Sequence, residues 1–362
     1  MSDTMVDAKP ANAMGLDGFA FVEFTSPDPA AMAGWFEKLG FTHVGTHKSK
    51  DVRHYAQGQI NFLLNMSGEG QVAGFREAHG ASANAMAFRV ADDAAALKLA
   101  VERGAVAVAG SNGPGELDIP AIEGIGGANL YLVGAQHDVW GTDFTPTGKG
   151  RDDASVGLDV LDHLTHNLQR GRMDYWADYY ERIFDFRQIR YFDIEGQATG
   201  LFSKAMTAPD DKIRIPLNES QDEHSQIEEF IKDYRGEGIQ HIALTTDDIF
   251  ATVDRLRANG IVFQDSPETY FDMIDQRLPG HGHDVAEMRR RRILIDGAPE
   301  TGGGLLLQIF TANMVGPIFF EIIQRKGNDG FGEGNFKALF ESIELDQIRR
   351  GVVPGASEKA DG

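Results

Sequence analysis

The sequence predicts an α+β protein of two domains, each made of two βαβββ units that form curved, mixed sheets. Three observations predict this class. With 362 residues, the chain exceeds what one ordinary hydrophobic core accommodates. A strand followed by an amphipathic helix occurs near the start of each half. Residues 84–105 also align with residues 240–261 without a gap, and internal similarity on this scale indicates duplication.

The first unit of each half begins with a strand and a helix. Residues 19–24 and 161–168 are strand-like segments. Residues 27–41 then place apolar side chains at helical spacing and end at Gly40, and residues 171–186 repeat the pattern. We therefore expect the two halves to begin in the same way.

The second unit of each half is the gapless pair. In both segments a strand, an Asp-Asp turn and an amphipathic helix follow one another, and the helices stop at Gly104 and Gly260. Short strands are expected after each strand and helix. In the second half they are 186–194, 200–206, 213–219, 261–265, 291–296, 304–311 and 317–325.

The repeat predicts the domain organisation. Residues 1–150 form an N-terminal pair of units without a metal site, with a structural or oligomerisation role. Residues 151–350 form the C-terminal pair that carries the chemistry, and residues 351–362 are a flexible tail. Asn335 is a natural N-cap for an amphipathic helix at 336–350, which we expect to cover the second sheet as a lid.

Composition excludes several kinds of function. The chain has no cysteine, which excludes disulfides, thiolate metal sites and cysteine nucleophiles. The formal net charge of −21 argues against a nucleic-acid partner, because binding to phosphate needs a basic surface. No apolar run has the length of a membrane span, and the N-terminus lacks a signal-peptide pattern. We expect a cytoplasmic protein without membrane contact.

The stretch "DHLTHN" contains two histidines three positions apart. Because the segment is strand-like, His163 and His166 should face opposite ways. In the gapless alignment His241 stands where the first half has Ala85, and the strand 19–24 has no histidine either. Imidazoles at equivalent positions of one half only indicate a site in that half.

A carboxylate completes the candidate site. Glu321 lies within a run of Phe and Ile, where an ionised side chain needs an ion pair or a metal. An ion pair with Arg325 or with a residue of another strand is the structural alternative. Two histidines and one carboxylate with open positions form the facial triad of non-haem Fe(II) oxygenases, although zinc accepts the same ligands.

A group of motifs gives the chain a family resemblance. In order they are "DHLTHN", "IPLNE", "SQIEEF", "GIQHIAL", "RLPGHGHD", "LLLQIFT", "FFEIIQRKG" and "GFGEGNFKALF". Over residues 155–350 the chain resembles the 4-hydroxyphenylpyruvate dioxygenases, which have the vicinal-oxygen-chelate fold. The first half resembles that family only in its architecture.

The resemblance implies a metal, a reaction and a set of site residues. It implies that Fe(II) binds His163, His241 and Glu321, and that 4-hydroxyphenylpyruvate and dioxygen become homogentisate and CO2. It also implies a homo-oligomer, a dimer or a tetramer. The implied substrate-pocket residues are Ser203, Asn218, Gln226, Gln240, Gln308, Phe310, Phe319, Asn335 and Phe336. On an ideal strand Gln240 points away from His241, which favours an indirect role.

Three alternatives remain open at this point. Hydroxymandelate synthase uses the same ligands and substrate, but Phe336, Pro216 and Asn218 match the dioxygenase pattern. A metal-free binding protein of the same fold would lack a bound metal. A zinc or nickel isomerase of the glyoxalase type shares its ligands across halves or chains, and the first half offers no such ligands.

Overall fold

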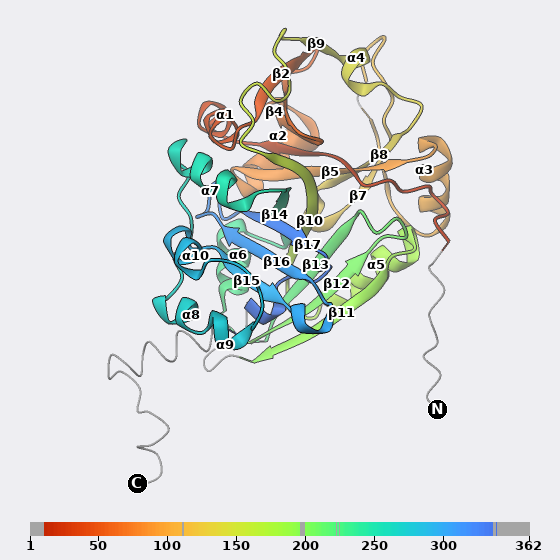
Figure 1. The fold of residues 1–362 in the computed structure, drawn as a ribbon. Coiled ribbons are helices and arrows are strands. Elements are labelled where there is room, and N and C mark those ends of the chain that lie inside the picture. The colour runs from red at the N-terminus through yellow and green to blue at the C-terminus, as the bar shows by residue number, and fades with distance from the viewer. Residues whose placement is uncertain are drawn as a thin grey trace.

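The computed structural model describes residues 11–110, 112–195, 200–221, 223, 225–335 and 338. Two curved sheets dominate it, one from each half of the chain (Figure 1). The first sheet has nine strands in the order β6-β7-β8-β5-β1-β4-β3-β2-β9, and the second has eight in the order β11-β12-β13-β10-β14-β17-β16-β15. The predicted α+β fold class is confirmed.

The first sheet uses strands that end before residue 147. Its strands are β1 (Phe19–Thr25), β2 (Thr42–His47), β3 (Val52–Gln57), β4 (Ile60–Asn65), β5 (Ser82–Val90), β6 (Ala107–Val108), β7 (Ala121–Glu123), β8 (Asn129–Gly134) and β9 (Phe144–Pro146). Its helices are α1 (Pro29–Lys38), α2 (Gly70–His79), α3 (Asp93–Glu102), the short 3-10 helix η1 (Ile125–Gly127) and α4 (Val139–Asp143).

The second sheet repeats this order with more helices. Its strands are β10 (Leu158–Leu168), β11 (Arg187–Glu195), β12 (Gly200–Thr207), β13 (Arg214–Ser220), β14 (Gly238–Thr246), β15 (Leu294–Gly297), β16 (Leu305–Phe310) and β17 (Phe319–Lys326). Its helices are α5 (Met173–Phe184), α6 (Gln226–Tyr234), α7 (Ile249–Ala258), α8 (Glu268–Asp272), α9 (Ile274–Arg277), α10 (Val285–Arg291) and the 3-10 helix η2 (Pro299–Thr301).

Three of the four equivalent helices, α1, α3 and α7, begin for the same local reason. Asp28, Asp92 and Asp248 precede α1, α3 and α7, and each side chain accepts a hydrogen bond from a backbone N–H three residues later. Such caps satisfy donors that the first helical turn leaves unpaired. The Asp-Asp turns of the sequence are therefore helix starts.

The strand pairing shows the duplication directly. β1 pairs in parallel with β4 and antiparallel with β5, and β10 pairs in the same way with β13 and β14. β5 pairs in parallel with β8, as β14 does with β17. Each position of the first sheet near β1, β5 and β8 therefore has an equivalent in the second sheet.

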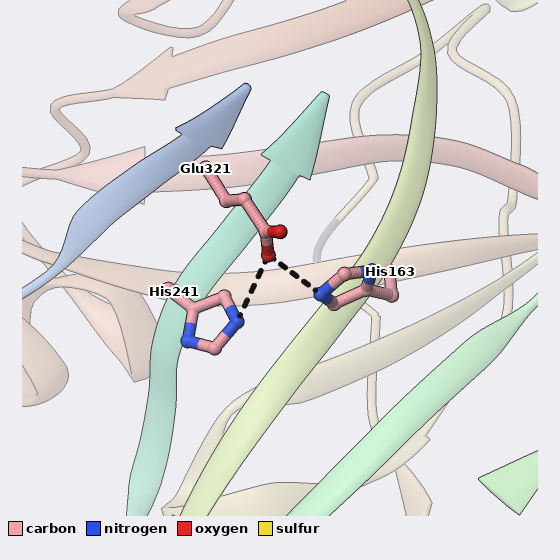
Figure 2. Close-up of side chains that lie close together, drawn as sticks. All are labelled: His163, His241 and Glu321. Atoms are coloured by element: carbon pink, nitrogen blue, oxygen red, sulfur yellow. Dashed lines mark ion pairs between the residues drawn. The ribbon is translucent and has the colours of Figure 1, made fainter. Parts of the chain in front are cut away.

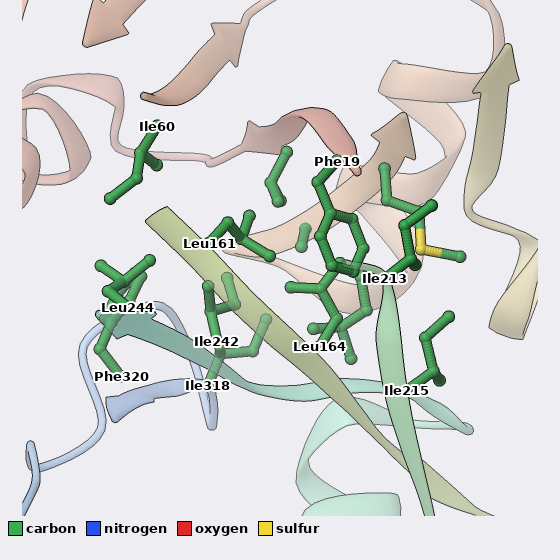
Figure 3. Packing of buried hydrophobic residues seen from close by; sticks show 14 of the residues in the cluster. Phe19, Ile60, Leu161, Leu164, Ile213, Ile215, Ile242, Leu244, Ile318 and Phe320 are labelled. Carbon is green, nitrogen blue, oxygen red and sulfur yellow. The ribbon is translucent and has the colours of Figure 1, made fainter. Parts of the chain in front are cut away.

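The two sheets share one apolar core. Phe19 and Ile60 of the first sheet belong to the same buried cluster as Leu161 and Ile242 of the second (Figure 3). Such burial is the main favourable term in folding, at about 25 cal/mol per Å² of apolar surface. Leu161, on β10, therefore belongs to a core that includes residues of both sheets.

One predicted strand is wrong. Residues 261–265 form no strand, and Phe263 makes only an isolated bridge to Thr311. Because β16 is already paired with β15 and β17, only the position after its end remains open to this segment. The predicted lid helix at 336–350, apart from Ala338, and the tail at 351–362 lie outside the described residues. None of the helices in the described ranges is long and apolar enough to cross a membrane.

Candidate metal centre

The three predicted metal ligands lie together on adjacent strands. His163 comes from β10, His241 from β14 and Glu321 from β17, and their side chains point toward one another (Figure 2). Glu321 Oε2 is 3.1 Å from His163 Nε2 and 3.6 Å from His241 Nε2. One ligand atom from each residue lies within 4.8 Å of the other two. This is the only such group of three or more His, Asp or Glu side chains in the part of the chain that the structure describes.

The strand register explains why these three side chains meet. His163 and Glu321 are both register partners of Ala243, one on each side of β14. His241 precedes Ala243 by two residues and so lies on the same face. Because Ala243 is small, the three longer side chains can converge above it.

Two irregularities of the sheet lie beside the histidines. Between Leu161 and His163, β10 advances two residues while β14 advances one, so Asp162 is the extra residue of a β-bulge. Between Thr165 and His166 the extra residue is Gln240, on β14. Each bulge thus places a polar residue immediately before a histidine and turns its side chain out of strict alternation.

Both bulged residues hold the ring that follows them. His163 Nδ1 lies 2.8 Å from Asp162 Oδ1, and His241 Nδ1 lies 2.5 Å from Gln240 Oε1. An acceptor at Nδ1 makes that nitrogen the protonated one and leaves Nε2 as the ligating atom. Gln240 therefore does not turn away from His241 as an ideal strand predicts.

The electrostatics of the two rings differ. Burial alone lowers the pKa of His163, but the Glu321 carboxylate and Asp162 raise it above its ordinary value. Burial and the charge of His163 hold the pKa of His241 well below its usual range. A neutral imidazole is the form that binds metals. The site pairs one neutral imidazole with a second imidazole in a field of two carboxylates, which suits a cation between them.

The donor set fits a divalent metal ion. Two imidazole nitrogens and one carboxylate oxygen are accepted by Fe(II) and by Zn(II). His163 and Glu321 are each 2% exposed, and Glu321 makes no ion pair with Arg325 within the described ranges. The guanidinium of Arg325 pairs with Asp162 instead, so the ion pair expected with Arg325 is wrong, whereas Glu321 does pair with His163 and His241 on other strands.

Besides Gln240, three predicted pocket residues contact the ligands directly, and Asn335 reaches them through Gln308. Gln308 Nε2 donates to Glu321 Oε1 at 3.2 Å, and its Oε1 accepts from Asn335 Nδ2 at 2.9 Å. Phe319 stacks on the His241 ring with centroids 5.0 Å apart, and Phe310 meets the same ring edge-on at 6.4 Å. Amide groups and aromatic walls therefore lie directly beside the ligands.

The remaining pocket residues are placed less directly. Ser203 and Asn218 are register partners on β12 and β13, and Asn218 is in turn the partner of Asn167 on β10. Gln226 begins α6 and is exposed. Phe336 lies outside the described residues.

The second histidine of "DHLTHN" faces the other side, as predicted. His166 is fully buried, and its Nε2 lies 2.8 Å from the hydroxyl of Tyr180 on α5. Burial lowers its pKa to about 3, so this ring is neutral. His166 is a packing residue of the opposite face.

Sequence reasoning missed two residues beside His163, Asp162 and Phe331. Asp162 is 3% exposed and accepts from His163 and from Arg325. Phe331 packs edge-on against the His163 ring at 5.3 Å. Asp162 precedes His163 directly, so strict alternation along a strand predicts that its side chain points away from the His163 ring. The bulge that reverses this orientation cannot be predicted from the periodicity of the sequence.

Comparison with known proteins is decisive for the family. The model described as "Hydroxyphenylpyruvate dioxygenase, HPPD, N-terminal" matches residues 11–145. The model of the "Glyoxalase/Bleomycin resistance protein/Dioxygenase superfamily" matches residues 160–273. A 4-hydroxyphenylpyruvate dioxygenase of Pseudomonas aeruginosa is 57% identical over 94% of this chain and 97% of its own. The chain belongs to the 4-hydroxyphenylpyruvate dioxygenase family.

Other relatives of this dioxygenase family extend the comparison. Hemolysin VllY of Vibrio vulnificus is 56% identical over 97% of this chain and 100% of its own. A solved variant of 4-hydroxymandelate synthase from Streptomyces coelicolor superimposes with a TM-score of 0.78 at 25% identity, covering 92% of this chain and 100% of that one. The family resemblance and the prediction that the chain is a dioxygenase are confirmed.

Proposed function

We propose that this protein is an Fe(II)-dependent dioxygenase that converts 4-hydroxyphenylpyruvate and O2 into homogentisate and CO2. The observation that carries the proposal is the convergence of His163, His241 and Glu321 on one face of the second sheet. The named activity of the relative with 57% identity supports the choice of substrate.

Three protein ligands suit the proposed metal. His163, His241 and Glu321 would hold Fe(II) while leaving room for an α-keto acid and dioxygen, and the iron would supply the redox chemistry of an oxygenase. Zinc fits the same ligands but lacks redox chemistry. The dioxygenase relatives favour iron.

The side chains beside the ligands orient them and limit water. Gln308 fixes one oxygen of Glu321, which leaves the other oxygen directed at the two imidazoles. Phe319 and Phe310 provide an apolar wall at His241, against which an aromatic ring can pack. A wall of this kind keeps water away from a reactive oxidant.

The polar pocket residues are proposed to hold the substrate. Gln308 presents an amide next to Glu321, and Asn335 presents a second amide next to Gln308. Ser203 and Asn218 offer a hydroxyl and an amide on neighbouring strands. Gln240 acts through His241, whose ring it orients. For Phe336 and Gln226 the proposal rests on the family motif alone.

The first sheet is proposed to serve as scaffold and oligomerisation surface. We place the division near residue 150, between β9 and β10, where the two family models also part. A homo-oligomer in the cytoplasm remains a prediction, which sedimentation of the purified protein and cell fractionation would test.

Oxygen uptake tests the proposed function. The purified protein with added Fe(II) should consume O2 when 4-hydroxyphenylpyruvate is supplied, and a chelator should abolish the uptake. Chromatography of the product should give homogentisate, whereas hydroxymandelate would identify the synthase alternative. No uptake, or uptake that ignores the chelator, would overturn the proposal and favour a metal-free binding protein.

A further inference from the structure

A buried hydrogen-bond network connects one metal ligand to the glycine-rich segment 327–335. Arg325 lies at its centre, near the end of β17. Its Nε and Nη2 donate to the two oxygens of Asp162 at 2.8 and 2.7 Å. Its Nη1 donates to the backbone carbonyls of Asn328 and Gly330 at 2.9 and 2.7 Å. One guanidinium thus holds a side chain and a loop simultaneously.

The same carboxylate holds the metal ligand. Asp162 Oδ1 accepts from His163 Nδ1 at 2.8 Å as well as from Arg325. Asp162 is 3% exposed. The bulge of β10 places its side chain on the same side as the His163 ring, although the two residues are consecutive. A bidentate guanidinium and carboxylate pair fixes both partners in plane, so the His163 ring and the loop share one rigid anchor.

The loop also contacts the ligands by packing and at its far end. Phe331 packs edge-on against His163 at 5.3 Å, and Arg325 lies 5.9 Å from the same phenyl ring. Asn335 joins Glu321 through Gln308. Gly332 adopts φ of +79°, a left-handed conformation that favours glycine, and a Cβ there would collide with the Gln308 amide.

We infer that Asp162 and Arg325 are positioning residues that couple occupation of the metal site to the placement of segment 327–335. The inference rests on the proposed metal site. A metal ion that fixes His163 also fixes Asp162, then Arg325 and the two carbonyls it holds. By reciprocity of linked equilibria, a correctly placed loop must strengthen metal binding by the same factor.

The test uses Co(II) as an air-stable probe in the metal-free full-length protein. Binding is followed by calorimetry and by the visible Co(II) absorption, and loop placement by hydrogen–deuterium exchange in peptides that cover 327–335. In the wild type, Co(II) should slow exchange there by about 5- to 150-fold, the usual range of coupling between two sites.

Two variants should break the coupling. Asp162→Asn should weaken Co(II) binding by about 10- to 100-fold, shift the Co(II) absorption and remove the slowing of exchange. Arg325→Lys keeps the charge but loses the bidentate fork, so it should also remove the slowing. If Arg325→Lys fails to fold, Asp162→Asn, which changes one atom, carries the test alone.

A matched control comes from the same half of the chain. Arg291 makes a comparable bidentate pair with Asp254, at 3.0 and 2.7 Å, away from the metal ligands. Arg291→Lys should keep the wild-type Co(II) affinity and the slowing of exchange. The inference is overturned if the wild type shows no slowing, or if either Asp162→Asn or a folded Arg325→Lys retains it as Arg291→Lys does. Neither readout needs turnover, so a failure of the proposed reaction is seen separately, as absence of homogentisate from the wild type.

Discussion

The two sheets share a backbone plan but differ in the side chains at three positions. The register pairs Phe21 with Ala87 and Ala87 with Tyr131, as it pairs His163 with Ala243 and Ala243 with Glu321. His241 corresponds to Ala85 by the same count. Where the second sheet has His, His and Glu, the first therefore has Phe21, Ala85 and Tyr131.

The bulges are also shared. In the first sheet the extra residues of the β1–β5 pair are Ala20 and Asn84, at the positions of Asp162 and Gln240. The rings of Phe21 and Tyr131 lie 5.7 Å apart, so the convergence of side chains is preserved. The comparison teaches that the backbone brings these three positions together, and that a few side chains decide whether they offer a set of metal ligands or an apolar cluster.

The largest effect is expected from a change at Glu321, the position that Tyr131 occupies in the first sheet. Glu321→Gln should lose the metal and lower activity by on the order of 1,000-fold, because a neutral amide replaces the anionic ligand. Tyr131→Phe, at the equivalent position of the first sheet, should leave both unchanged. Metal analysis of the purified proteins and initial rates measure this. Equal metal content in the two variants would contradict the assignment of the site to the second sheet.

The next prediction separates the two histidines of β10. His166→Ala should keep the metal but destabilise the fold by about 2–4 kcal/mol, since it leaves a cavity and an unpaired Tyr180 hydroxyl. His163→Ala should lose the metal. Metal analysis and chemical denaturation of both variants provide the measurement. Loss of metal from His166→Ala would place that ring in the site.

The same position differs between the sheets in its response to acid. Phe24 occupies it in the first sheet and packs on Phe36 of α1, as His166 packs on Tyr180 of α5. The pKa of His166 is about 3 in the folded protein against 6.5 ordinarily, so the unfolded chain takes up the proton first. Stability is therefore fully present above pH 6.5 and falls by up to about 1.4 kcal/mol per pH unit as the pH drops from there toward 3.

A double substitution copies the solution of the first sheet. His166→Phe with Tyr180→Phe replaces the polar pair by two phenyl rings and should remove this part of the acid sensitivity. Denaturation midpoints between pH 4.5 and 7 would show it as a shallower dependence than that of the wild type. An unchanged slope would mean that other groups cause the loss.

Much of this comparison could be predicted from the sequence. The repeat offsets pointed to His163 and His241, and a carboxylate among apolar residues pointed to Glu321. Both signals depend only on residue type and spacing, which the sequence contains. Strand alternation also separated His163 from His166. The bulges at Asp162 and Gln240 could not be predicted, since they arise from how two strands pair. The strand expected at 261–265 is wrong for a similar reason: β16 already pairs with β15 and β17, so this segment forms only the bridge from Phe263 to Thr311, just beyond the end of β16.

The smallest expected effect concerns Glu23, which occupies the position of Thr165 in the first sheet. Glu23 is 5% exposed, and its Oε1 accepts from Asn84 Nδ2 at 2.6 Å. Burial raises its pKa above the ordinary 4.5, with Asn84 and Asn65 opposing the shift. The folded protein therefore binds the proton of the Glu23 carboxyl group more tightly than the unfolded chain does. The contribution of this proton to the free energy of unfolding is full below pH 4.5 and is lost as the pH rises through the pKa of Glu23 in the folded protein.

Glu23→Gln tests whether burial of this carboxyl group destabilises the folded protein. The amide keeps an acceptor for Asn84 but has no charge to bury, so the variant should gain stability relative to the wild type as the pH rises toward 8. Metal content should not change, because Glu23 is on β1 of the first sheet, whereas the three ligands are on strands of the second sheet. A difference between variant and wild type that stays constant from pH 4 to 8 would show that the pKa of Glu23 is the same in the folded and the unfolded protein, so that the side chains around Glu23 fully offset the cost of burying its charge.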